Sequence, residues 1–155
     1  MDHCYGLHTA GHLPIEEDGN IRKGKVGQDV SVEDAYDAAR LVTMNLLATL
    51  KSKVERNWTK NYPVYYYGCE QALFPTYGFA EEAGSLNNIK RIVKLTGFVN
   101  CVDGFAQQPQ VINGASDFIA EVFGEKGVHS RSAVGTNALP LNIPVEIEAI
   151  VELEP

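Results

Sequence analysis

Apolar residues recur at intervals of three or four positions in two parts of the chain, which is the spacing of one buried helix face. In the first part the stripe consists of Val32, Ala35, Tyr36, Ala39, Val42, Leu46 and Leu50. Ser31 precedes it as a candidate N-cap, with Asp34 three residues later. In the second part the stripe consists of Val111, Ile112, Ala115, Phe118, Ile119, Val122 and Phe123. This second helix is expected to begin near Pro109 and to end at Gly124, which suits a left-handed cap.

Strict alternation of apolar and polar residues predicts a strand near the end of the chain, because successive side chains of a strand point to opposite faces. Its apolar positions are Val145, Ile147, Ala149, Val151 and Leu153. The β-branched stretch 89–99 predicts another strand, with Val93, Leu95, Gly97 and Val99 on one face. Residues 5–13 and 131–139 predict two more strands. A tight turn at 140–144 would make 131–139 and the last strand a hairpin, with Leu139 opposite Val145.

The predicted order is strand, helix, strand, helix, strand, strand in a chain of 155 residues. With 45% apolar residues, this length is enough for one hydrophobic core, so we expect a single domain over residues 1–155. The order predicts an α+β fold in which a mixed sheet carries two helices on one face. The other face must then be polar or be covered by something else.

Residues 53–83 follow neither a helical nor a strand period, and they contain the single Trp and most of the Tyr residues. An irregular connection of this length is uncommon inside a compact domain, so we expect poor packing or a local subdomain. The functional alternative is an aromatic lid or a partner-binding loop.

The formal net charge of −7 disfavours nucleic acid as a partner, because it would repel a phosphate backbone. No apolar run of about 18 residues is present, so no membrane-spanning helix is expected. The first residues lack the basic and apolar segments of a secretory signal, which favours a cytoplasmic protein. Cys4, Cys69 and Cys101 are odd in number and far apart, which favours reduced thiols over disulfides or a zinc site.

Several stretches of the chain resemble the RidA/YjgF family of small proteins. The most specific is residues 129–154, HSRSAVGTNALPLNIPVEIEAIVELE, with its Arg-Ser opening, Leu-Pro turn and alternating strand. Further similar stretches are residues 9–14, 24–41, 89–100 and 109–127. The resemblance therefore covers most of the chain outside 53–83. The GKVG and INGASD segments are similar to the YjgF/chorismate-mutase-like endoribonuclease branch of the family.

This resemblance implies a chorismate-mutase-like fold of the bacillus type and a homotrimer, in which three sheets meet around a central barrel while the helices face outward. A small carboxylate-bearing metabolite would bind in clefts between the subunits. Three copies would also cover the sheet face that the two helices leave open. Some members of the family are mitochondrial, although no targeting segment is recognised in this chain.

Arg131 matches the family arginine that holds the ligand carboxylate, a role for which a planar guanidinium can donate two parallel hydrogen bonds. Glu146 matches the glutamate that, in deaminating members, orients the attacking water and moves its proton. Without the resemblance, the pattern would favour a surface arginine and a solvated glutamate. The resemblance further implies ligand contacts from Ala10, Gly11, His12, Asn113, Ser132 and Ala133. The family asparagine of the second helix matches either Asn113 or Ser116, and this chemistry needs no cofactor and no metal.

The chain departs from the deaminating members at two ligand positions. Ala10 stands where they have serine and Ala133 where they have cysteine, so contacts with the ligand would be lost or replaced by main-chain groups and water. The additional first strand of the family has no counterpart before Met1, and residues 53–83 form an insertion. Both features fit a shortened or mis-spliced gene model as well as a working variant.

In the expected hairpin, Arg131 lies opposite Leu153, about seven residues from the partner of Glu146. This separation is roughly 23 Å along the sheet, at about 3.3 Å per residue. One chain could therefore not bring both side chains to one ligand, and a shared site would require two subunits.

Three functions are consistent with these residues. The leading hypothesis is hydrolysis of reactive enamine or imine intermediates of the 2-aminoacrylate type to 2-keto acids and ammonia at intersubunit clefts. Because Ala10 and Ala133 cannot donate hydrogen bonds, the alternative is a non-catalytic trimer that binds small carboxylates or acts like a chaperone. The third is an endoribonuclease acting on single-stranded RNA, against which the chain lacks a suitable pair of histidines and a basic stripe. We expect its histidines to be surface or core residues, with His12 near the cleft.

Overall fold

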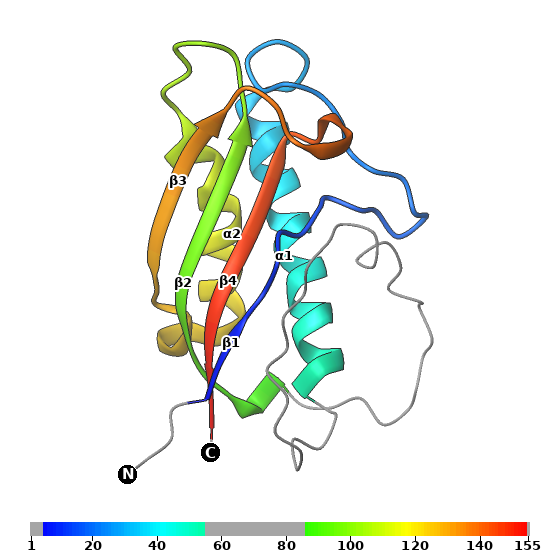
Figure 1. Ribbon diagram of the computed structural model, residues 1–155. Coiled ribbons are helices and arrows are strands. Elements are labelled where there is room, and N and C mark those ends of the chain that lie inside the picture. The colour runs from blue at the N-terminus through cyan, green and yellow to red at the C-terminus, as the bar shows by residue number, and fades with distance from the viewer. Residues whose placement is uncertain (1–4, 55–85, 155) are drawn as a thin grey trace.

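The computed structural model describes residues 5–54 and 86–154, which form one sheet with two helices on one of its faces (Figure 1). The elements follow in the predicted order: β1 (Tyr5–His8), α1 (Val32–Val54), β2 (Ile89–Asn100), α2 (Gln108–Phe123), β3 (Ser130–Thr136) and β4 (Val145–Leu153). The predicted α+β fold is therefore confirmed. The aromatic segment expected at 53–83 lies, apart from its first two residues, outside the described residues, as do Cys4 and Cys69.

Helix α1 begins, and helix α2 begins and ends, where the capping residues predicted. The Asp34 amide donates to Ser31 Oγ at 3.0 Å, and Ser31 Oγ donates to Asp34 Oδ2 at 2.8 Å, which caps α1. Pro109 lies in the first turn of α2, and Gly124, with a φ of 55°, ends this helix. The predicted stripe of α2 is wrong at Val122, whose side chain is 44% exposed on the last turn. Within the described ranges, neither helix is long and apolar enough to cross a membrane.

The strands lie in the order β1-β4-β2-β3, and β4 is antiparallel to both of its neighbours whereas β2 and β3 are parallel. The predicted hairpin of 131–139 with the last strand is therefore wrong. Strand β2 lies between them, because a central position best buries its long row of core residues. The connection crosses the end of β2, and two of its residues, Leu141 and Asn142, adopt left-handed φ values of 56°. As a result β3 ends at Thr136, earlier than predicted.

Both helices cover the same face because of the direction in which the chain crosses the sheet. Strands β1, β2 and β3 run parallel, and the crossovers through α1 and α2 move in the same direction along the strand order. Crossovers between parallel strands are right-handed in nearly all proteins, so two made in one direction place their helices on one face. We call this the inner face and the opposite one the outer face; in Figure 1 the helices lie behind the strands.

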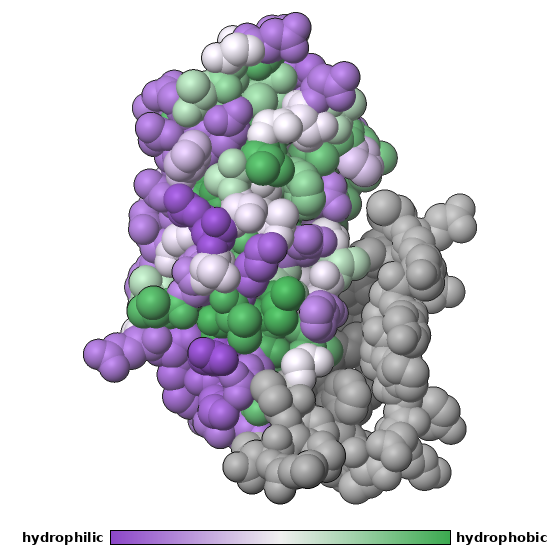
Figure 2. Space-filling view, turned by 60° about the vertical axis from the view of Figure 1, so that its left-hand side comes forward, coloured by the Kyte–Doolittle hydropathy of each residue, from purple (hydrophilic) through white to green (hydrophobic). Residues whose placement is uncertain are grey.

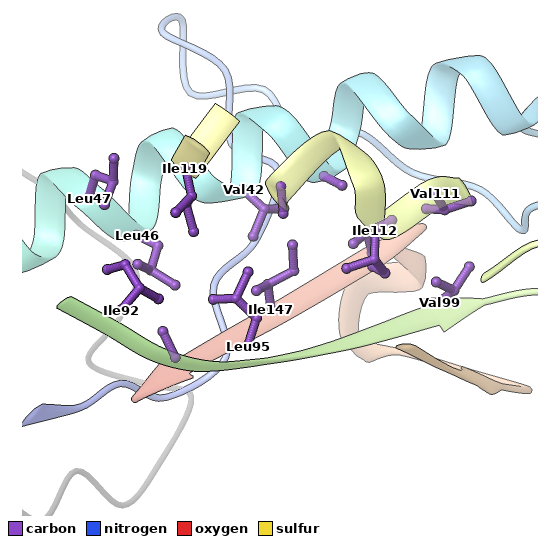
Figure 3. Packing of buried hydrophobic residues seen from close by; sticks show 14 of the residues in the cluster. Val42, Leu46, Leu47, Ile92, Leu95, Val99, Val111, Ile112, Ile119 and Ile147 are labelled. Carbon is purple, nitrogen blue, oxygen red and sulfur yellow. The ribbon is translucent and has the colours of Figure 1, made fainter. Parts of the chain in front are cut away.

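The hydrophobic core lies between the two helices and the inner face of the sheet (Figure 3). Its largest fully buried side chains include Val42, Leu46 and Leu50 of α1, Ile89, Ile92, Leu95 and Val99 of β2, Ile112 and Ile119 of α2, and Ile147 of β4. Gly97 permits the close approach of α2, since a Cβ there would lie 2.5 Å from Ile112 Cδ1. The expected core residue Val93 is only partly buried, because an irregularity in the β2–β4 pairing between Ile92 and Lys94 turns Ile92 inward instead.

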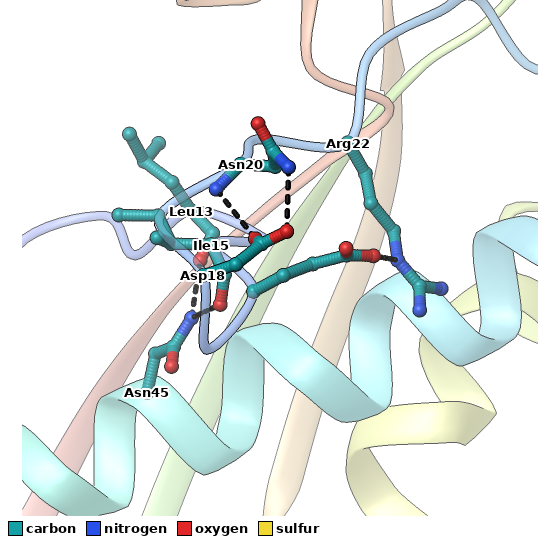
Figure 4. Close-up of polar contacts among 7 residues, drawn as sticks. Leu13, Ile15, Asp18, Asn20, Arg22 and Asn45 are labelled. Atoms are coloured by element: carbon teal, nitrogen blue, oxygen red, sulfur yellow. Dashed lines mark hydrogen bonds and ion pairs between the residues drawn. The ribbon is translucent and has the colours of Figure 1, made fainter.

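The segment after β1 continues along β4 and is tied to α1. Strand β1 is shorter than predicted, but the main-chain amides of Thr9 and His12 still donate to carbonyl oxygens of β4 at 2.9 Å each. From α1, Asn45 Nδ2 donates to the carbonyl oxygens of Leu13 at 3.0 Å and Ile15 at 2.9 Å (Figure 4). The residues around position 11 are therefore held between the sheet and the helix.

No described element covers the outer face of the sheet. Its side chains alternate with those of the core and include His8, Lys94, Thr96, Phe98, Glu146, Glu148, Ile150 and Glu152. Polar and apolar patches also adjoin one another on the side of the molecule shown in Figure 2. Near the irregular part of β2, Glu152 is only 6% exposed and accepts hydrogen bonds from Lys90 Nζ at 2.7 Å and Arg91 Nε at 2.6 Å. These two partners lower the pKa of Glu152 from 4.5 to about 2.

Candidate functional site

Arg131 lies on β3 and is paired with Leu95 of β2, so its side chain points to the inner face, toward α2. Its Nη1 donates to Asn113 Oδ1 at 2.8 Å and to Ser116 Oγ at 3.0 Å. These two residues are three positions apart on α2 and therefore share one side of the helix. Both candidates for the family asparagine thus contact Arg131. Among the described residues, Nε and Nη2 make no hydrogen bond, so the edge of the guanidinium that can bind a carboxylate through two bonds is available.

Ser116 also contacts His129, which the sequence analysis did not assign to the site. Ser116 Oγ lies 3.1 Å from His129 Nε2, and His129 Nδ1 lies 2.6 Å from the carbonyl oxygen of Gly127. One signal in the sequence was available: His129 precedes Arg131 by two residues, and residues two apart on an extended chain share a face. The structure therefore adds His129, through Ser116, to the surroundings of Arg131.

Glu146 lies on β4 opposite Phe98, so its side chain is on the outer face. Its carboxylate packs against the main chain of Gly11, where a Cβ would lie 1.8 Å from Glu146 Oε1. The structure therefore brings these two candidate residues together and explains why position 11 is a glycine. Burial raises the pKa of Glu146 above its ordinary value, and the nearby charge of Glu148 raises it further. This carboxyl group holds a proton more readily than an exposed glutamate does.

His12 is held by its main chain, which pairs with Ile147 of β4. Its Nδ1 donates to the carbonyl oxygen of Ala10 at 2.9 Å, which leaves Nε2 of the neutral ring as an acceptor. Burial lowers the pKa of His12, and the hydrogen bond to Ala10 opposes that shift only in part. No hydrogen bond joins His12 to Glu146 in the described part of the chain. His12 is therefore a neutral, partly buried neighbour of the Glu146 region.

Arg131 and Glu146 lie on opposite faces of the sheet in one chain. Their partners on β2 are Leu95 and Phe98, which point to the inner and the outer face respectively. Three positions along β2 and two strand spacings separate their main chains by roughly 14 Å. The predicted separation along a hairpin was wrong, because β3 and β4 do not pair. One chain still cannot bring both side chains to one ligand, but for a different and stronger reason: the sheet lies between them.

The remaining candidate residues divide between the two faces. Ala133 is paired with Gly97 and packs against the core on the same face as Arg131. Ser132 is paired with Thr96, so its hydroxyl is on the outer face, as is Glu146. Ala10 is exposed next to Gly11. The candidate residues therefore form an arginine group with Asn113 and Ala133, and a glutamate group in which Gly11, next to Ala10, contacts Glu146. His12 pairs with Ile147 of the inner face, and Ser132 is two strands away from Glu146, so the structure does not bring either of them against that carboxylate.

The two groups differ in chemistry. The arginine group can bind an anion through charge-assisted hydrogen bonds, whereas the glutamate group offers a partly buried carboxyl that can take up or release a proton. Among residues 5–54 and 86–154, no cluster of three or more His, Cys, Asp or Glu side chains is arranged to hold a metal ion.

Comparisons with known proteins agree with this fold. Protein TCP17 of Trypanosoma cruzi is 33% identical over 153 residues, which cover 97% of this chain and 78% of that protein. The crystal structure of Atu1372, a protein of unknown function from Agrobacterium tumefaciens, is 40% identical with a TM-score of 0.76 and covers 96% of this chain and 76% of that one. The structure of Escherichia coli TdcF with bound serine shares only the fold, at 18% identity and a TM-score of 0.54, over 96% of this chain and 81% of that one.

The family model described as "YjgF/chorismate mutase-like, putative endoribonuclease" matches residues 61–153, more than half of the chain. The sequence resemblance, the four-stranded mixed sheet with two helices on one face and these matches all agree. The chain belongs to the YjgF/chorismate mutase-like family.

Proposed function

We propose that this protein hydrolyses small 2-imino acids and their enamine tautomers to 2-keto acids and ammonia, at sites that join Arg131 of one protomer to Glu146 of another. Membership of the family supports a Rid-type role. The observation that carries the proposal is the guanidinium of Arg131, which is held through Nη1 by α2 and keeps Nε and Nη2 for a carboxylate. Serine, the ligand in the TdcF structure, also has a carboxylate.

The proposed reaction needs one water molecule and no cofactor. The carboxylate of the imino acid binds Arg131, which places the C=N carbon at a set distance from the guanidinium. Glu146 takes a proton from water while the water oxygen bonds to that carbon, and the electron pair of the C=N bond moves to nitrogen. Glu146 then returns the proton to the nitrogen, which gives a carbinolamine with an OH and an NH2 group on the former C=N carbon. Glu146 next takes the proton of that OH group and passes it to the nitrogen, the C–N bond breaks, the C=O bond forms and ammonia leaves. The raised pKa of Glu146 suits these proton transfers, because the group holds a proton without retaining it permanently.

The proposal requires an oligomer, since the sheet separates the two residues within one chain. A homotrimer in which the β3 edge of one sheet meets the outer face of its neighbour would bring Arg131 of one protomer toward Glu146 of the other and would cover Phe98 and Ile150. The expected mass in solution is three times that of one chain. A monomer at all concentrations would contradict the proposal, because no complete site could form.

The direct test is the release of ammonia from 2-iminopropanoate that is generated in the assay from 2-aminoacrylate. We expect the full-length protein to exceed the rate in buffer and Arg131→Ala to return to that rate. Glu146→Gln should lose turnover but still bind pyruvate, the 2-keto acid product, because the carboxylate contacts of Arg131 remain. Binding is measured by ligand-observed NMR.

Matched controls are available away from both groups. Arg22 forms an exposed ion pair with Glu16 on the segment before α1, so Arg22→Ala changes charge equally without touching the site. Glu17 is exposed on the same segment and serves as the control for Glu146. If Arg131→Ala and Glu146→Gln keep the rate of Arg22→Ala and Glu17→Gln, the proposed chemistry is wrong.

A second candidate, a trimer that binds small carboxylates without turnover, is favoured by Ala10 and Ala133. The methyl group of Ala133 packs against the core beside Gly97 and cannot donate a hydrogen bond to a ligand. If pyruvate binds and Arg131→Ala abolishes the binding, while ammonia release stays at the rate in buffer, this second function replaces the first.

The family description also names an endoribonuclease. RNA binding depends on positive charge along the backbone path, and the net charge of −7 opposes it. We therefore expect no cleavage of single-stranded RNA by the purified protein in the presence of a chelator. Cleavage that persists through purification and disappears in Arg131→Ala or His12→Ala would overturn this expectation.

A further inference from the structure

His129 connects the core of the protein to Arg131 through a chain of three hydrogen bonds. Its Nδ1 is 2.6 Å from the carbonyl oxygen of Gly127, and its Nε2 is 3.1 Å from Ser116 Oγ. Ser116 Oγ in turn accepts from Arg131 Nη1 at 3.0 Å. The imidazole therefore lies between the turn that ends α2 and the side chain that holds the guanidinium.

The chain of hydrogen bonds has a defined direction. A carbonyl oxygen only accepts, so His129 Nδ1 must carry the hydrogen that is donated to Gly127. In the neutral ring, Nε2 is then an acceptor, and the Ser116 hydroxyl donates to it. With its hydrogen directed at His129, the Ser116 oxygen presents its lone pairs to Arg131. The imidazole thus sets the orientation in which Ser116 can accept from the guanidinium.

The far end of this chain is anchored in tightly packed structure. Gly127 is buried, and a Cβ there would lie 2.7 Å from the carbonyl oxygen of Ile119. The Gly127 carbonyl that receives His129 therefore belongs to a segment packed directly on α2. The other hydrogen bond of Arg131, to Asn113 Oδ1, holds the guanidinium less firmly. Asn113 is exposed, so water competes with Arg131 for its amide oxygen.

We infer that His129 is a positioning residue, which acts through Ser116 to hold the Arg131 guanidinium in the orientation that binds a carboxylate. This inference rests on the proposed role of Arg131 as the carboxylate-binding residue. Without His129 the Ser116 hydroxyl rotates among several partners. The guanidinium then loses its part-buried hydrogen bond to Ser116 and keeps the one to Asn113. Hydrogen bonds to charged groups are among the stronger ones, so carboxylate binding should weaken about tenfold.

The experiment measures the Kd of pyruvate by ligand-observed NMR for the full-length protein and for a double-mutant cycle of His129→Ala and Ser116→Ala. If the two residues act as one unit, each single variant weakens binding about tenfold and the double variant is no weaker than either. His129→Gln, whose side-chain oxygen can accept at the position of Nε2, should recover most of the affinity. Lys51→Ala, at an exposed position of α1, is the control, because it lies neither on the sheet nor on α2.

A purely structural role predicts different results. His129→Leu fills the space of the ring without an acceptor, so it should keep the melting temperature close to that of the parent protein and still lose affinity. If His129→Leu and His129→Ala bind pyruvate like Lys51→Ala, or if the effects of the two single variants multiply in the double variant, the inference is overturned. Arg131→Ala distinguishes failure of the proposed function from failure of this inference. If Arg131→Ala leaves the Kd of pyruvate unchanged, the proposed function fails. If Arg131→Ala weakens binding and the His129 variants do not, only the role of His129 is removed.

Discussion

Glu146 depends on the absence of a single side chain on the neighbouring segment. Its carboxylate occupies the space that a Cβ at position 11 would fill, and the burial that results raises its pKa. Arg131 is in the opposite situation, because it is held by direct hydrogen bonds to side chains of α2. At this scale, close packing at Gly11 and hydrogen bonding at Arg131 set the two chemical properties that the proposed reaction requires.

Gly11→Ala is expected to remove turnover while leaving carboxylate binding nearly unchanged. The added methyl group would displace the Glu146 carboxylate, and a displacement of about 1 Å in a catalytic group can lower a rate by about 100-fold. The measurement compares ammonia release with the Kd of pyruvate in the same variant. Gly6→Ala is the matched control, because the nearest atom to a Cβ there is His8 Nε2 at 4.0 Å. Equal ammonia release by the two variants would contradict the placement of Glu146.

The two helices and the sheet are held together by contacts that local sequence preferences do not reveal. Helices α1 and α2 cross closely at Gly114, where a Cβ would lie 2.1 Å from the carbonyl oxygen of Tyr36. On the other side of the sheet, Glu152 of β4 ties down the irregular start of β2 through Lys90 and Arg91. Both contacts join elements that are distant in the sequence.

Gly114→Ala should destabilise the protein, although alanine favours an isolated helix by about 1 kcal/mol over glycine. The methyl group would push α1 and α2 apart, and such overpacking costs about 1–3 kcal/mol. Urea unfolding followed by circular dichroism measures the change in free energy. Ala120→Gly, at an exposed position of α2, reports the propensity term alone. A gain of stability in Gly114→Ala would show that the two helices are not in close contact at this point.

Glu152→Gln should lower the free energy of unfolding at neutral pH, and this effect should disappear below about pH 2. The pKa of Glu152 is lowered from 4.5 in its ordinary state to about 2 in the folded protein, because it accepts hydrogen bonds from Lys90 and Arg91. A carboxylate whose pKa is lowered by folding stabilises the protein at pH values above its pKa in the unfolded chain. That contribution is lost as the pH falls from 4.5 through about 2. Urea unfolding at a series of pH values should therefore show the parent and variant curves converging in acid. A constant difference at all pH values would contradict this assignment.

At the scale of the molecule, residues 5–54 and 86–154 present one helical surface and one sheet face that no other described element covers. Phe98 and Ile150 lie on that open face together with Glu146 and Glu148. In the proposed trimer this face is buried against the β3 edge of a neighbouring copy, which carries Arg131, so the Arg131 and Glu146 groups meet only between protomers. Oligomerisation is then part of the proposed mechanism, because it joins side chains that the sheet separates within one chain.

Phe98→Glu is expected to reduce the mass in solution from three chains to one and to abolish ammonia release. The new charge would be buried against a neighbour that has no partner for it, whereas in a single chain it would be solvated. Light scattering coupled to size exclusion measures the mass, and circular dichroism checks that the chain remains folded. Val122→Glu is the control, since Val122 is an exposed apolar residue on α2. If Phe98→Glu keeps the mass of Val122→Glu, the open sheet face is not the interface.

The sequence by itself determined the identity and order of the helices and strands. The stripe of α1, its Ser31 cap, the end of α2 at Gly124 and the alternating β4 all depend on residues that are near one another in the chain. Local periodicity and capping are therefore visible without the fold. The family was also recognisable from the motif around Arg131 and Glu146, together with most of the residues proposed for the site.

Only the tertiary structure decided which strands are neighbours and which side chains meet. Strand β2 lies between β3 and β4 because its core residues are best buried when it has a neighbouring strand on each side. The two-residue periodicity of β3 and β4 fits this order and the predicted hairpin equally well. The links from Arg131 to Ser116 and His129, and from Gly11 to Glu146, join positions that are far apart in sequence or separated by a turn. Such contacts depend on packing between elements, and a local pattern of apolar and polar residues does not reveal that packing.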